Sequence, residues 1–338
     1  MAKLNIGLIG AGRMGRVFAQ HIALSATRVR FVAVADTFPG VAAEVAAQFG
    51  AERSYTNHLD LLEQNDIQAV VIVTPTGTHV DIVRDAAAAG KQIFCEKPLS
   101  LTVSGCDEAL AAVEKAKVIL QVGFMRRFDP AYRAAKERIL NGEIGDPVMI
   151  KSLGRDPRRT SLEFARRANS GGILLDMGIH DFDSSRWLMG SEVHRVYSEG
   201  GCLVFPELKE VGDLDNACVN LKFVNGALGN IDVSRNAVYG YDIRTEVLGS
   251  KGAIQIGRLQ HTPLLILTPN NVAHDTLPYF TERYRDAYAA ELQHFISCAL
   301  EDRQPEVSGA DARMATAIGV AATLSYDEQR PVQLEEVL

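Results

Sequence analysis

Three side chains could move a proton to or from a substrate oxygen, and the first of them is Lys97. It lies in Glu96-Lys97-Pro98, directly after the strand-like run Gln92–Cys95. In doubly wound sheets ligands bind at the carboxyl ends of the strands, which is where this lysine would lie. Its ammonium could donate a hydrogen bond to a substrate oxygen or exchange a proton with it. The alternative is a surface turn lysine, the commonest position for this residue type.

The other two are Asp176 and His180, which lie four residues apart in a helix-like segment. In a helix this spacing places both side chains on one face. A carboxylate then fixes the imidazole tautomer and stabilises its protonated form, as a general base requires. The alternative is an exposed ion pair, which is common and contributes roughly tenths of a kcal/mol. No metal is expected, because neither a third ligand nor an H-E-x-x-H spacing accompanies the pair.

A glycine-rich segment near the start of the chain predicts a dinucleotide site. Gly10-Ala11-Gly12-Arg13-Met14-Gly15 fits G-x-G-x-x-G and stands between a strand-like and a helix-like run. The first glycine permits the turn, the second lets the backbone approach a pyrophosphate, and the third allows close helix–strand packing. The phosphates would then lie at the helix N-terminus, where N–H groups favour negative charge.

Asp36 predicts which dinucleotide is bound. It ends the second strand-like run 21 residues after Gly15, a spacing typical of the acid that accepts hydrogen bonds from the adenosine ribose. A solvated turn aspartate is the alternative. Thr37, Phe38 and Pro39 follow without an adjacent Arg or Lys to hold a 2′-phosphate, and a carboxylate would repel one. The sequence therefore favours NAD over NADP.

Other polar side chains are weaker candidates for substrate contact. Arg126-Arg127 could point a cation at a substrate or cap the surface, and Tyr239-Gly240-Tyr241-Asp242 could hydrogen-bond a polyol or pack in a sheet. The five arginines from Arg155 to Arg167 could bind an anion, but a solvated loop is the preferred interpretation. No G-x-S-x-G elbow or P-loop lysine is present, so acyl and phosphoryl transfer have no support.

Residues 1–124 alternate between strand-like and helix-like segments, which predicts the sheet that positions these groups. Strands are expected at Leu4–Ile9, Arg30–Ala35, Ala69–Thr74, Gln92–Cys95 and Val118–Val122, and helices at Arg13–Leu24, Val41–Phe49, His79–Ala89 and Cys106–Lys115. Apolar strands that alternate with helices indicate a parallel sheet covered on both faces. We therefore expect an α/β dinucleotide-binding domain over 1–124.

A second α/β domain is expected over 125–338, because the pattern changes from about Val148. Strand-like segments lie at Ala217–Phe223, Leu228–Val233, Ile243–Leu248 and Pro263–Leu267, separated by turn signals such as Asn225-Gly226. This close spacing indicates an antiparallel sheet. Helices are expected at Asp176–Leu188, Tyr284–Glu301 and Gly309–Leu324, and the C-terminal helices are free to pack back across the domain boundary.

Composition argues against several classes of function. The 338 residues are 47% hydrophobic and carry a formal net charge of −7, which argues against a general affinity for nucleic acid or anionic membranes. No apolar run is long enough to span a membrane, and Met1–Leu4 passes directly into a strand-like run, so no signal peptide is expected. Five scattered cysteines without a C-x-x-C pair fit a reducing compartment, so a cytoplasmic protein is expected.

The chain resembles the glucose–fructose oxidoreductase and inositol dehydrogenase (Gfo/Idh/MocA) family over nearly its whole length. The resemblance rests on Gly10–Gly15, Asp36, Thr74-Pro75-Thr76 with His79, Glu96-Lys97-Pro98, Gly123–Arg127, Asp176 with His180, Tyr239–Asp242, and Ala287–Glu291 with Phe295. It implies an N-terminal Rossmann domain and a C-terminal α/β domain with an open, mainly antiparallel sheet that often mediates dimers or tetramers. It also implies that the cofactor is bound by Gly10, Gly12, Arg13, Met14, Asp36, Thr74, Pro75, Thr76, His79, Glu96 and Lys97.

The resemblance further assigns the residues that contact the substrate. It implies that Lys97 touches the reacting hydroxyl and that Asp176 and His180 form the proton-handling dyad. Within the family the chain looks most like inositol 2-dehydrogenases, in which the residues matching Arg127, Tyr239 and Tyr241 contact the cyclitol.

One departure concerns the choice of substrate. Inositol dehydrogenases of the family place a histidine and an asparagine where this chain has Gly154 and Asp156. These positions help to read substrate hydroxyls, so Asp156 is expected to contact the substrate. The departure leaves myo-inositol, scyllo-inositol and a pyranose sugar open as substrates.

The sequence thus predicts a homo-oligomeric, NAD-dependent oxidoreductase that oxidises a secondary alcohol of a neutral cyclitol or sugar. His180, held by Asp176, would take the hydroxyl proton while Lys97 polarises the oxygen. One alternative is a nucleotide-sensing regulator on the same scaffold, against which the three intact residues argue. Another is a transhydrogenating enzyme that never releases its cofactor.

Overall fold

The computed structural model describes residues 3–338, which form two compact units. The first unit extends to Met125 and also includes Asp286–Met314, and the second contains Arg126–Arg285 and Ala315–Leu338. The sequence divides the chain after residue 124, and it assigned 286–314 to the second domain. Met1 and Ala2, which begin the segment in which no signal peptide is expected, lie outside the described residues.

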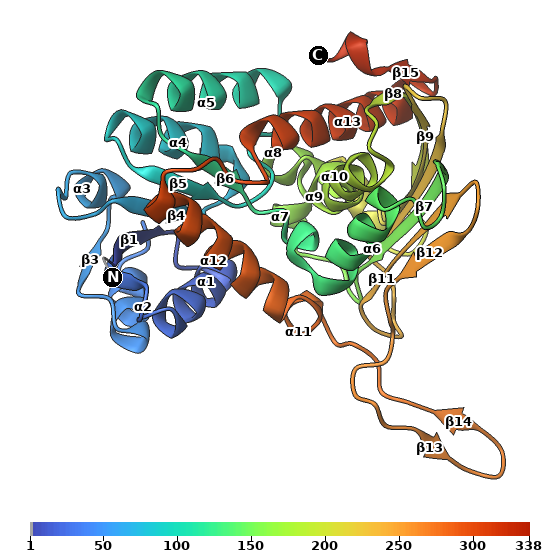
Figure 1. Ribbon diagram of the computed structural model, residues 1–338, viewed down its shortest axis with the longest axis horizontal. Coiled ribbons are helices and arrows are strands. Elements are labelled where there is room, and N and C mark those ends of the chain that lie inside the picture. Colours follow the sequence, from blue (N-terminus) through green and yellow to red (C-terminus); the bar gives the residue numbers. More distant parts are fainter. Residues whose placement is uncertain (1–2) are drawn as a thin grey trace. The chain divides into compact units, whose positions relative to one another are not determined.

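A six-stranded parallel sheet with the strand order β3-β2-β1-β4-β5-β6 is the centre of the first unit (Figure 1). Its strands are β1 (Leu4–Ile9), β2 (Val29–Ala35), β3 (Arg53–Tyr55), β4 (Ala69–Ile72), β5 (Gln92–Cys95) and β6 (Leu120–Val122). Every residue of β4 is 0% exposed, as expected for a central strand covered on both faces. The predicted parallel α/β sheet is confirmed, with β3 as an additional strand.

The strands of this sheet are joined by helices, and one late helix completes its core. The connecting helices are α1 (Arg13–Leu24), α2 (Val41–Phe49), α3 (His58–Leu62), α4 (His79–Ala88) and α5 (Val103–Ala116). Helix α12 (Arg285–Glu301) belongs to this unit from Asp286 onward. Its Phe295 ring lies 5.8 Å from that of Phe94 in β5, which in turn lies 5.0 Å from that of Phe18 in α1. Residues far apart in the chain therefore form one aromatic core.

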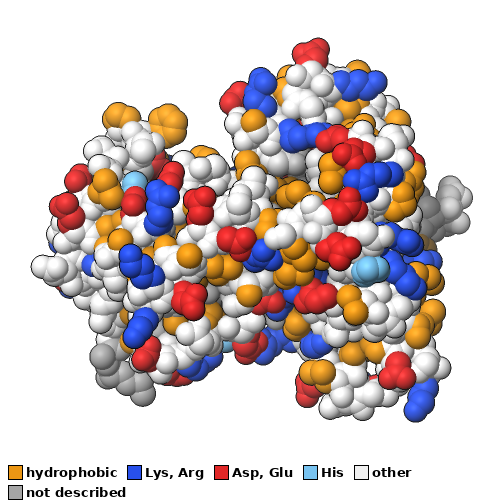
Figure 2. Space-filling view, turned by 90° about the horizontal axis from the view of Figure 1, so that it is seen from above, with side chains coloured by type: hydrophobic (Ala, Val, Ile, Leu, Met, Phe, Trp, Pro, Cys, Tyr) orange, Lys and Arg blue, Asp and Glu red, His pale blue; other side chains and the backbone are white. Residues whose placement is uncertain are grey.

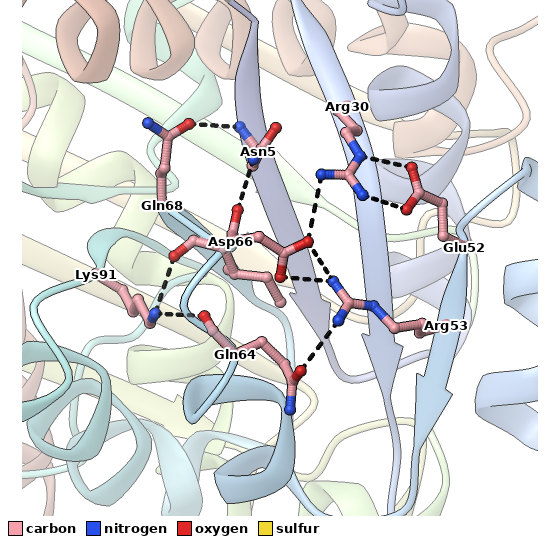
Figure 3. A network of polar contacts seen from close by, with 9 residues as sticks. Asn5, Arg30, Glu52, Arg53, Gln64, Asp66, Gln68 and Lys91 are labelled. Atoms are coloured by element: carbon pink, nitrogen blue, oxygen red, sulfur yellow. Dashed lines mark hydrogen bonds and ion pairs between the residues drawn. The ribbon is translucent and has the colours of Figure 1, made fainter.

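Charged side chains tie together the amino ends of several strands in this sheet (Figure 3). Asp66, just before β4, accepts hydrogen bonds from Arg53 of β3 at 2.6 and 2.7 Å and from Arg30 of β2 at 3.3 Å. Lys91, just before β5, donates to two backbone carbonyl oxygens at 2.9 Å each, and burial lowers its pKa. These contacts occupy the amino edge of the sheet, opposite the carboxyl edge at which the candidate cofactor residues lie.

The second unit is built on a seven-stranded mixed sheet with the order β12-β11-β7-β10-β9-β8-β15. Its strands are β7 (Pro147–Arg155), β8 (Val193–Gly201), β9 (Asn216–Phe223), β10 (Leu228–Ser234), β11 (Asp242–Gly249), β12 (Ala253–Ile256) and β15 (Val332–Gln333). Neighbouring strands are antiparallel except β7 and β10, which run parallel. The prediction of a mainly antiparallel sheet is confirmed, although β8, β12 and β15 were not predicted.

One face of this sheet is packed against helices. In β9, Ala217, Val219 and Leu221 are buried while Cys218 and Asn220 between them are exposed, and this alternation is typical of a half-buried strand. The helices of the unit are α6 (Pro130–Leu140), α7 (Leu162–Ala165), α8 (Arg167–Ser170), α9 (Gly172–Asp176), α10 (Gly178–Met189), α11 (Phe280–Arg283) and the end of α13 (Gly309–Glu328). Helix α10 packs on β7 and β10 (Figure 1).

The helix expected over Asp176–Leu188 is interrupted, which corrects the prediction. Helix α9 ends at Asp176 and α10 begins at Gly178, with Met177 between them. The N–H of His180 points to the carbonyl oxygen of Met177 at 3.4 Å, an i to i−3 contact rather than the i to i−4 bond of a regular helix. The break at Met177 therefore lies between Asp176 and His180, and the two residues belong to successive helices rather than to one regular helix.

A two-stranded hairpin extends away from the sheet of the second unit (Figure 1). It contains β13 (Ile266–Leu267) and β14 (Val272–Ala273), so the strand expected over Pro263–Leu267 is shorter than predicted. Its base is held where the N–H of Tyr241 donates to the carbonyl oxygen of Leu277 at 2.7 Å.

Figure 2 shows acidic and basic side chains interspersed over the visible face. Within residues 3–338, no helix is both long and apolar enough to cross a membrane.

Candidate active site

The turn between β1 and α1 has the geometry that the glycine motif predicts. Gly10 has a φ of +95°, and a Cβ there would lie 2.6 Å from the carbonyl oxygen of Val73. A Cβ at Gly15 would lie 2.1 Å from the carbonyl oxygen of Gly10, so glycine is needed for α1 to pack this closely. Gly12 is the N-cap of α1, and the space where its Cβ would stand is open. The helix start can therefore receive a pyrophosphate on its backbone N–H groups.

The carboxylate of Asp36 is fixed beside this turn by two backbone N–H groups. Oδ2 accepts a hydrogen bond from Ala11 at 2.8 Å, and Oδ1 accepts one from Phe38 at 2.9 Å. The first bond ties the end of β2 directly to the glycine turn. Each carboxylate oxygen can accept more than one hydrogen bond, so both retain capacity for ribose hydroxyls.

His79 supports the loops that follow β4 and β5. Its side chain is buried, with Nδ1 2.7 Å from the carbonyl oxygen of Pro98 and Nε2 2.8 Å from that of Thr74. Burial lowers the pKa of this imidazole, and the two carbonyl contacts oppose the shift. Both ring nitrogens face the backbone, so His79 holds the Thr74–Thr76 loop in place. This differs from the direct cofactor contact that the sequence assigned to it.

Glu96 and Lys97 follow β5 at the same edge of the sheet. The carboxylate of Glu96 is 8% exposed, and its Oε2 accepts a hydrogen bond from the backbone N–H of Lys97 at 3.0 Å. Burial raises the pKa of Glu96 to about 7, against the opposing charge of Lys97. Lys97 itself is partly exposed. The structure thus makes Glu96 a buried support of the Lys97 backbone.

In the second unit, a buried arginine brings two predicted site residues together. Arg235, directly after β10, is 1% exposed, and it donates from Nη1 to Oδ2 of Asp176 at 3.2 Å and from Nη2 to Oδ2 of Asp213 at 3.1 Å. Asp213 also accepts from the backbone N–H of Ile173 at 2.6 Å. Burial would lower the pKa of Arg235, but three carboxylates outweigh it and raise that pKa: Asp176, Asp213 and Asp156. Asp156 and Asp176 therefore act on the same guanidinium.

Sequence reasoning missed both Arg235 and Asp213. Burial raises the pKa of Asp213, while Arg235 and backbone N–H groups oppose the shift. The available signal was the position of Arg235 at the carboxyl end of an expected strand, Leu228–Val233. Nothing in its local spacing connects it with Asp176, which lies 59 residues earlier.

His180 lies in the first turn of α10, a helix held by two buried ion pairs. Asp181 accepts from Arg126 at 2.5 and 3.3 Å and from Ser152 Oγ at 2.6 Å. Asp183 accepts from Nε and Nη2 of Arg127 at 2.9 and 2.6 Å. Asp181 and Asp183 follow His180 closely in the sequence, so these contacts fix the position of its helix.

Two predicted substrate contacts have other partners in the structure. Arg127 is 7% exposed and forms the bidentate pair with Asp183, which differs from the open cation that the sequence assigned to the substrate. The hydroxyl of Tyr239 donates to Asp242 Oδ2 at 2.9 Å and lies 3.3 Å from Arg155 Nη1. The direction of these side chains was not predictable without their partners.

Tyr241 and the arginines between residues 155 and 167 are distributed over separate contacts. Tyr241 is 5% exposed, and its ring packs edge-on against those of Tyr279 and Tyr284 at 6.1 and 6.3 Å. The arginines have separate contacts: Arg155 with Asp232, Arg158 with the Tyr279 ring, Arg159 with Glu207, Arg166 with Glu163 and Arg167 with Asp327. These arginines do not converge on one anion site in the described structure.

No metal cluster is found among residues 3–338: no three His, Cys, Asp or Glu side chains are grouped so that they could hold an ion. Within each unit, several of the candidate residues share one edge of a sheet or one cluster of charges. Gly10, Asp36, Thr74 and Lys97 all follow parallel strands of the first sheet. In the second unit, Asp156, Asp176 and Arg235 form one charged cluster.

Both halves of the chain match one family of known proteins. Residues 4–124 match the family described as "Oxidoreductase family, NAD-binding Rossmann fold", and residues 136–334 match "Oxidoreductase family, C-terminal alpha/beta domain". The family description names NAD, so the cofactor predicted from Asp36 is confirmed. The glycine turn and the fixed Asp36 carboxylate fit that cofactor.

Full-length relatives and a solved structure are similar to this chain. The scyllo-inositol 2-dehydrogenase (NAD(+)) of Bacillus subtilis is 42% identical over 98% of this chain and 97% of its own length. The myo-inositol 2-dehydrogenase of Thermotoga maritima is 41% identical over 99% and 100%. The crystal structure of scyllo-inositol dehydrogenase from Lactobacillus casei with bound NAD(H) and scyllo-inositol has a TM-score of 0.94 at 30% identity, over 99% and 100%. As its sequence predicted, the chain belongs to the Gfo/Idh/MocA family of NAD-binding oxidoreductases.

Proposed function

We propose that this protein is an NAD-dependent inositol 2-dehydrogenase, which oxidises one secondary alcohol of myo- or scyllo-inositol to the ketone. The observation that carries the proposal is the presence of Lys97, Asp176 and His180 in a chain similar, over its full length, to enzymes named for this activity. A regulator on the same scaffold would have no need to keep three groups able to handle a proton.

The proposed reaction removes a proton and a hydride from one carbinol group. His180 accepts the hydroxyl proton, and Lys97 donates a hydrogen bond to the oxygen from which that proton leaves. NAD⁺, which the glycine turn and Asp36 would hold, would supply the acceptor for the carbinol hydride. Asp176, itself held by Arg235, stabilises the imidazolium that His180 becomes. The protein thus supplies orientation and a preset electrostatic environment.

The remaining site residues are assigned by the same proposal. Backbone groups of Gly10, Gly12, Arg13 and Met14 hold the pyrophosphate, and Asp36 holds the adenosine ribose. The loops with Thr74, Pro75 and Thr76 and with Glu96 contact the cofactor, while His79 positions them through its two carbonyl contacts.

Asp156 and Tyr241 are proposed to recognise the hydroxyl groups of the substrate by hydrogen bonding. Asp156 lies close enough to Arg235 to raise the pKa of its guanidinium. A carboxylate at this position accepts hydrogen bonds and repels anions, which favours a neutral polyol. Arg127 and Tyr239 support the site indirectly. Their hydrogen bonds to Asp183 and Asp242 hold the adjacent segments of the polypeptide in place.

A neutral pyranose is the second candidate substrate, because of one difference from related inositol dehydrogenases. A Cβ at Gly154 would lie 2.9 Å from Oδ2 of the buried Asp181. A side chain at this position would therefore have to displace the Asp181 carboxylate, which is paired with Arg126. The residues that bind the substrate hydroxyl groups therefore differ from those of related inositol dehydrogenases, and the preferred substrate can differ as well.

We also propose that the protein is a cytoplasmic homo-oligomer. The hairpin of β13 and β14 exposes a consecutive run of large apolar side chains, Leu264, Leu265, Ile266 and Leu267, each more than half exposed. A two-stranded hairpin is marginally stable in water by itself, so burial against a second copy would stabilise it. All five cysteines are free thiols, which agrees with a reducing compartment.

A screen of substrates tests the proposal. Formation of NADH is followed with myo-inositol, scyllo-inositol, chiro-inositol, glucose and xylose, and with glucose 6-phosphate and gluconate as charged counterparts of glucose. An inositol isomer is expected to give the highest kcat/KM, and each charged compound is expected to react less well than glucose. Turnover confined to the sugars would favour the second candidate. Binding of NAD without turnover of any compound would favour the regulator.

A further inference from the structure

Two glutamates of the first unit are buried with unsatisfied oxygens. Glu96 follows β5 and is 8% exposed, and Glu291 lies on α12 and is 0% exposed. Neither carboxylate oxygen of Glu291 has a hydrogen-bond partner among the described residues, and Oε1 of Glu96 has none either. An ionised carboxylate left in this state is costly, so at least one proton must reside in the pair.

The two carboxyl groups lie close enough to interact. Burial raises the pKa of Glu291 well above its usual value, and the charge of Glu96 raises it further. The cation of Lys97 also acts on Glu96, and Glu96 in turn raises the pKa of the neighbouring Cys95 thiol, which burial raises first. The burial of Glu291 and its two unpartnered oxygens favour its protonated form, while Glu96 gains or loses a proton near pH 7.

The surroundings hold the pair against the sheet. Gln121 of β6 is fully buried, and its Nε2 donates to the backbone carbonyl oxygen of Glu291 at 2.8 Å. Gly123 leaves room for the Glu96 carboxyl group, because a Cβ there would lie 3.0 Å from Cδ of Glu96. The first contact comes from β6 and the second from the residue that follows it, so the end of β6 fixes both glutamates.

Ionisation of Glu96 affects Lys97 directly. Oε2 of Glu96 accepts a hydrogen bond from the backbone N–H of Lys97 at 3.0 Å. A carboxylate is a stronger acceptor than a protonated acid, so this bond is strongest when Glu96 is charged. A protonated Glu291 can donate to Glu96 and so stabilise that charge.

We propose that Glu96 and Glu291 share a single proton above neutral pH and act together as positioning residues for Lys97, an inference that rests on the role of Lys97 in the proposed function. As the pH falls through about 7, Glu96 takes up a second proton and its hold on the Lys97 backbone weakens. The kcat/KM for inositol oxidation therefore falls more steeply on the acid side than protonation of the general base His180 alone would cause, because Glu96 binds one further proton.

Variants of both glutamates test the pair through its pH profile. Glu291→Gln imitates the protonated acid, so its kcat/KM is expected to stay within about 3-fold of the wild-type value. The acid fall, which is the decrease in kcat/KM as the pH is lowered, is expected to keep its wild-type midpoint. Glu291→Leu removes the donor and is expected to move the fall upward by about one pH unit, with about 5-fold lower kcat/KM at pH 7. Glu96→Gln cannot ionise, so it is expected to remove the contribution of Glu96 to the acid fall and to leave only the acid limb of the general base His180. Thermal melts establish that each variant is folded.

Infrared spectroscopy gives a second readout that needs no substrate. At pH 8 the wild-type protein is expected to show the C=O band of a buried protonated carboxyl group, and Glu291→Gln is expected to lose it. The matched control is Glu301→Gln at the end of the same helix, whose side chain is 57% exposed and paired with Arg303. This control is expected to keep both the band and the pH profile.

Two results would overturn the proposal. A band that persists in Glu291→Gln places the proton elsewhere. A shift of the acid fall to lower pH by more than one unit in Glu291→Gln means that Glu291 is ionised in the wild type. Failure of the proposed function is recognised separately, because an enzyme without inositol turnover still gives the infrared result.

Discussion

Arg235 and Asp176 form an ion pair 3.2 Å long between a buried guanidinium and a partly accessible carboxylate. The same guanidinium holds Asp213 at 3.1 Å, so one side chain fixes two carboxylates from different parts of the second unit. Asp176 is therefore oriented before any substrate arrives. This arrangement gives the proposed dyad a rigid support that a helical pair alone would not have.

Replacement of Arg235 tests that support. Arg235→Lys keeps the charge but cannot make the same two-pronged contact, so Asp176 should lose its fixed position. We expect kcat to fall by about 10²-fold, the cost of misplacing a catalytic group by about 1 Å, together with a lower Tm. Steady-state kinetics and thermal melts measure both effects, with Arg138→Lys at an exposed ion pair as the control. Unchanged kcat would remove Arg235 from the support of the site.

Replacement of Asp36 tests the choice of cofactor. The carboxylate repels a 2′-phosphate, so the wild-type protein should favour NAD over NADP by at least about tenfold in kcat/KM, which corresponds to about 1.4 kcal/mol. Asp36→Ala should narrow that ratio, although loss of the bond to Ala11 also loosens the turn. The ratio of kcat/KM values for the two cofactors measures the effect. Equal use of both by the wild type would contradict the assignment.

Replacement of His180 tests the general base. His180→Ala should lower kcat by about 10²–10⁴, while the affinity for NAD stays nearly unchanged. Because Asp176 and His180 act as one unit in the proposal, the double replacement by alanine should cost little more than His180→Ala alone. Kinetics under conditions limited by chemistry and a separate titration with NAD distinguish the two effects. Additive losses would mean that the residues act independently.

Replacement of hairpin leucines tests self-association. Leu265→Ser with Leu267→Ser should reduce the molar mass in solution, because the hairpin loses the apolar surface that a second copy would bury. Light scattering after size-exclusion chromatography measures that mass. Leu24→Ser, at a residue of the first unit that is 75% exposed, is the control. A wild-type mass equal to one chain would refute the oligomer itself.

Local patterns predicted the cofactor half of the molecule well. The glycine turn, α1 and Asp36 lie within one short stretch of chain, and their geometry follows from steric and hydrogen-bonding rules that act between neighbours. Gly10 and Gly15 are needed because a Cβ at either position would collide with the nearby backbone. Strand β4 is recognised as buried because all of its residues are apolar. Such features depend little on the rest of the fold.

Contacts between distant residues explain what the sequence did not predict. Arg235 meets Asp176 and Asp213 only once the second sheet has formed, and the partner of Arg127 lies 56 residues away. The break at Met177 likewise has no strong local signal, such as a proline within the expected helix. Side-chain direction and helix continuity at these positions are set by tertiary packing, which periodicity cannot reveal.

The return of residues 286–314 to the first unit has a consequence for synthesis of the protein. Chains emerge from the ribosome N-terminus first, and domains tend to fold as they become complete. The β5 core of this unit lacks Phe295 until nearly the whole polypeptide has been made. The intervening segment, 126–285, is therefore translated before the Rossmann sheet has its last helix. Expression of residues 1–124 alone would leave Phe94 without that covering ring.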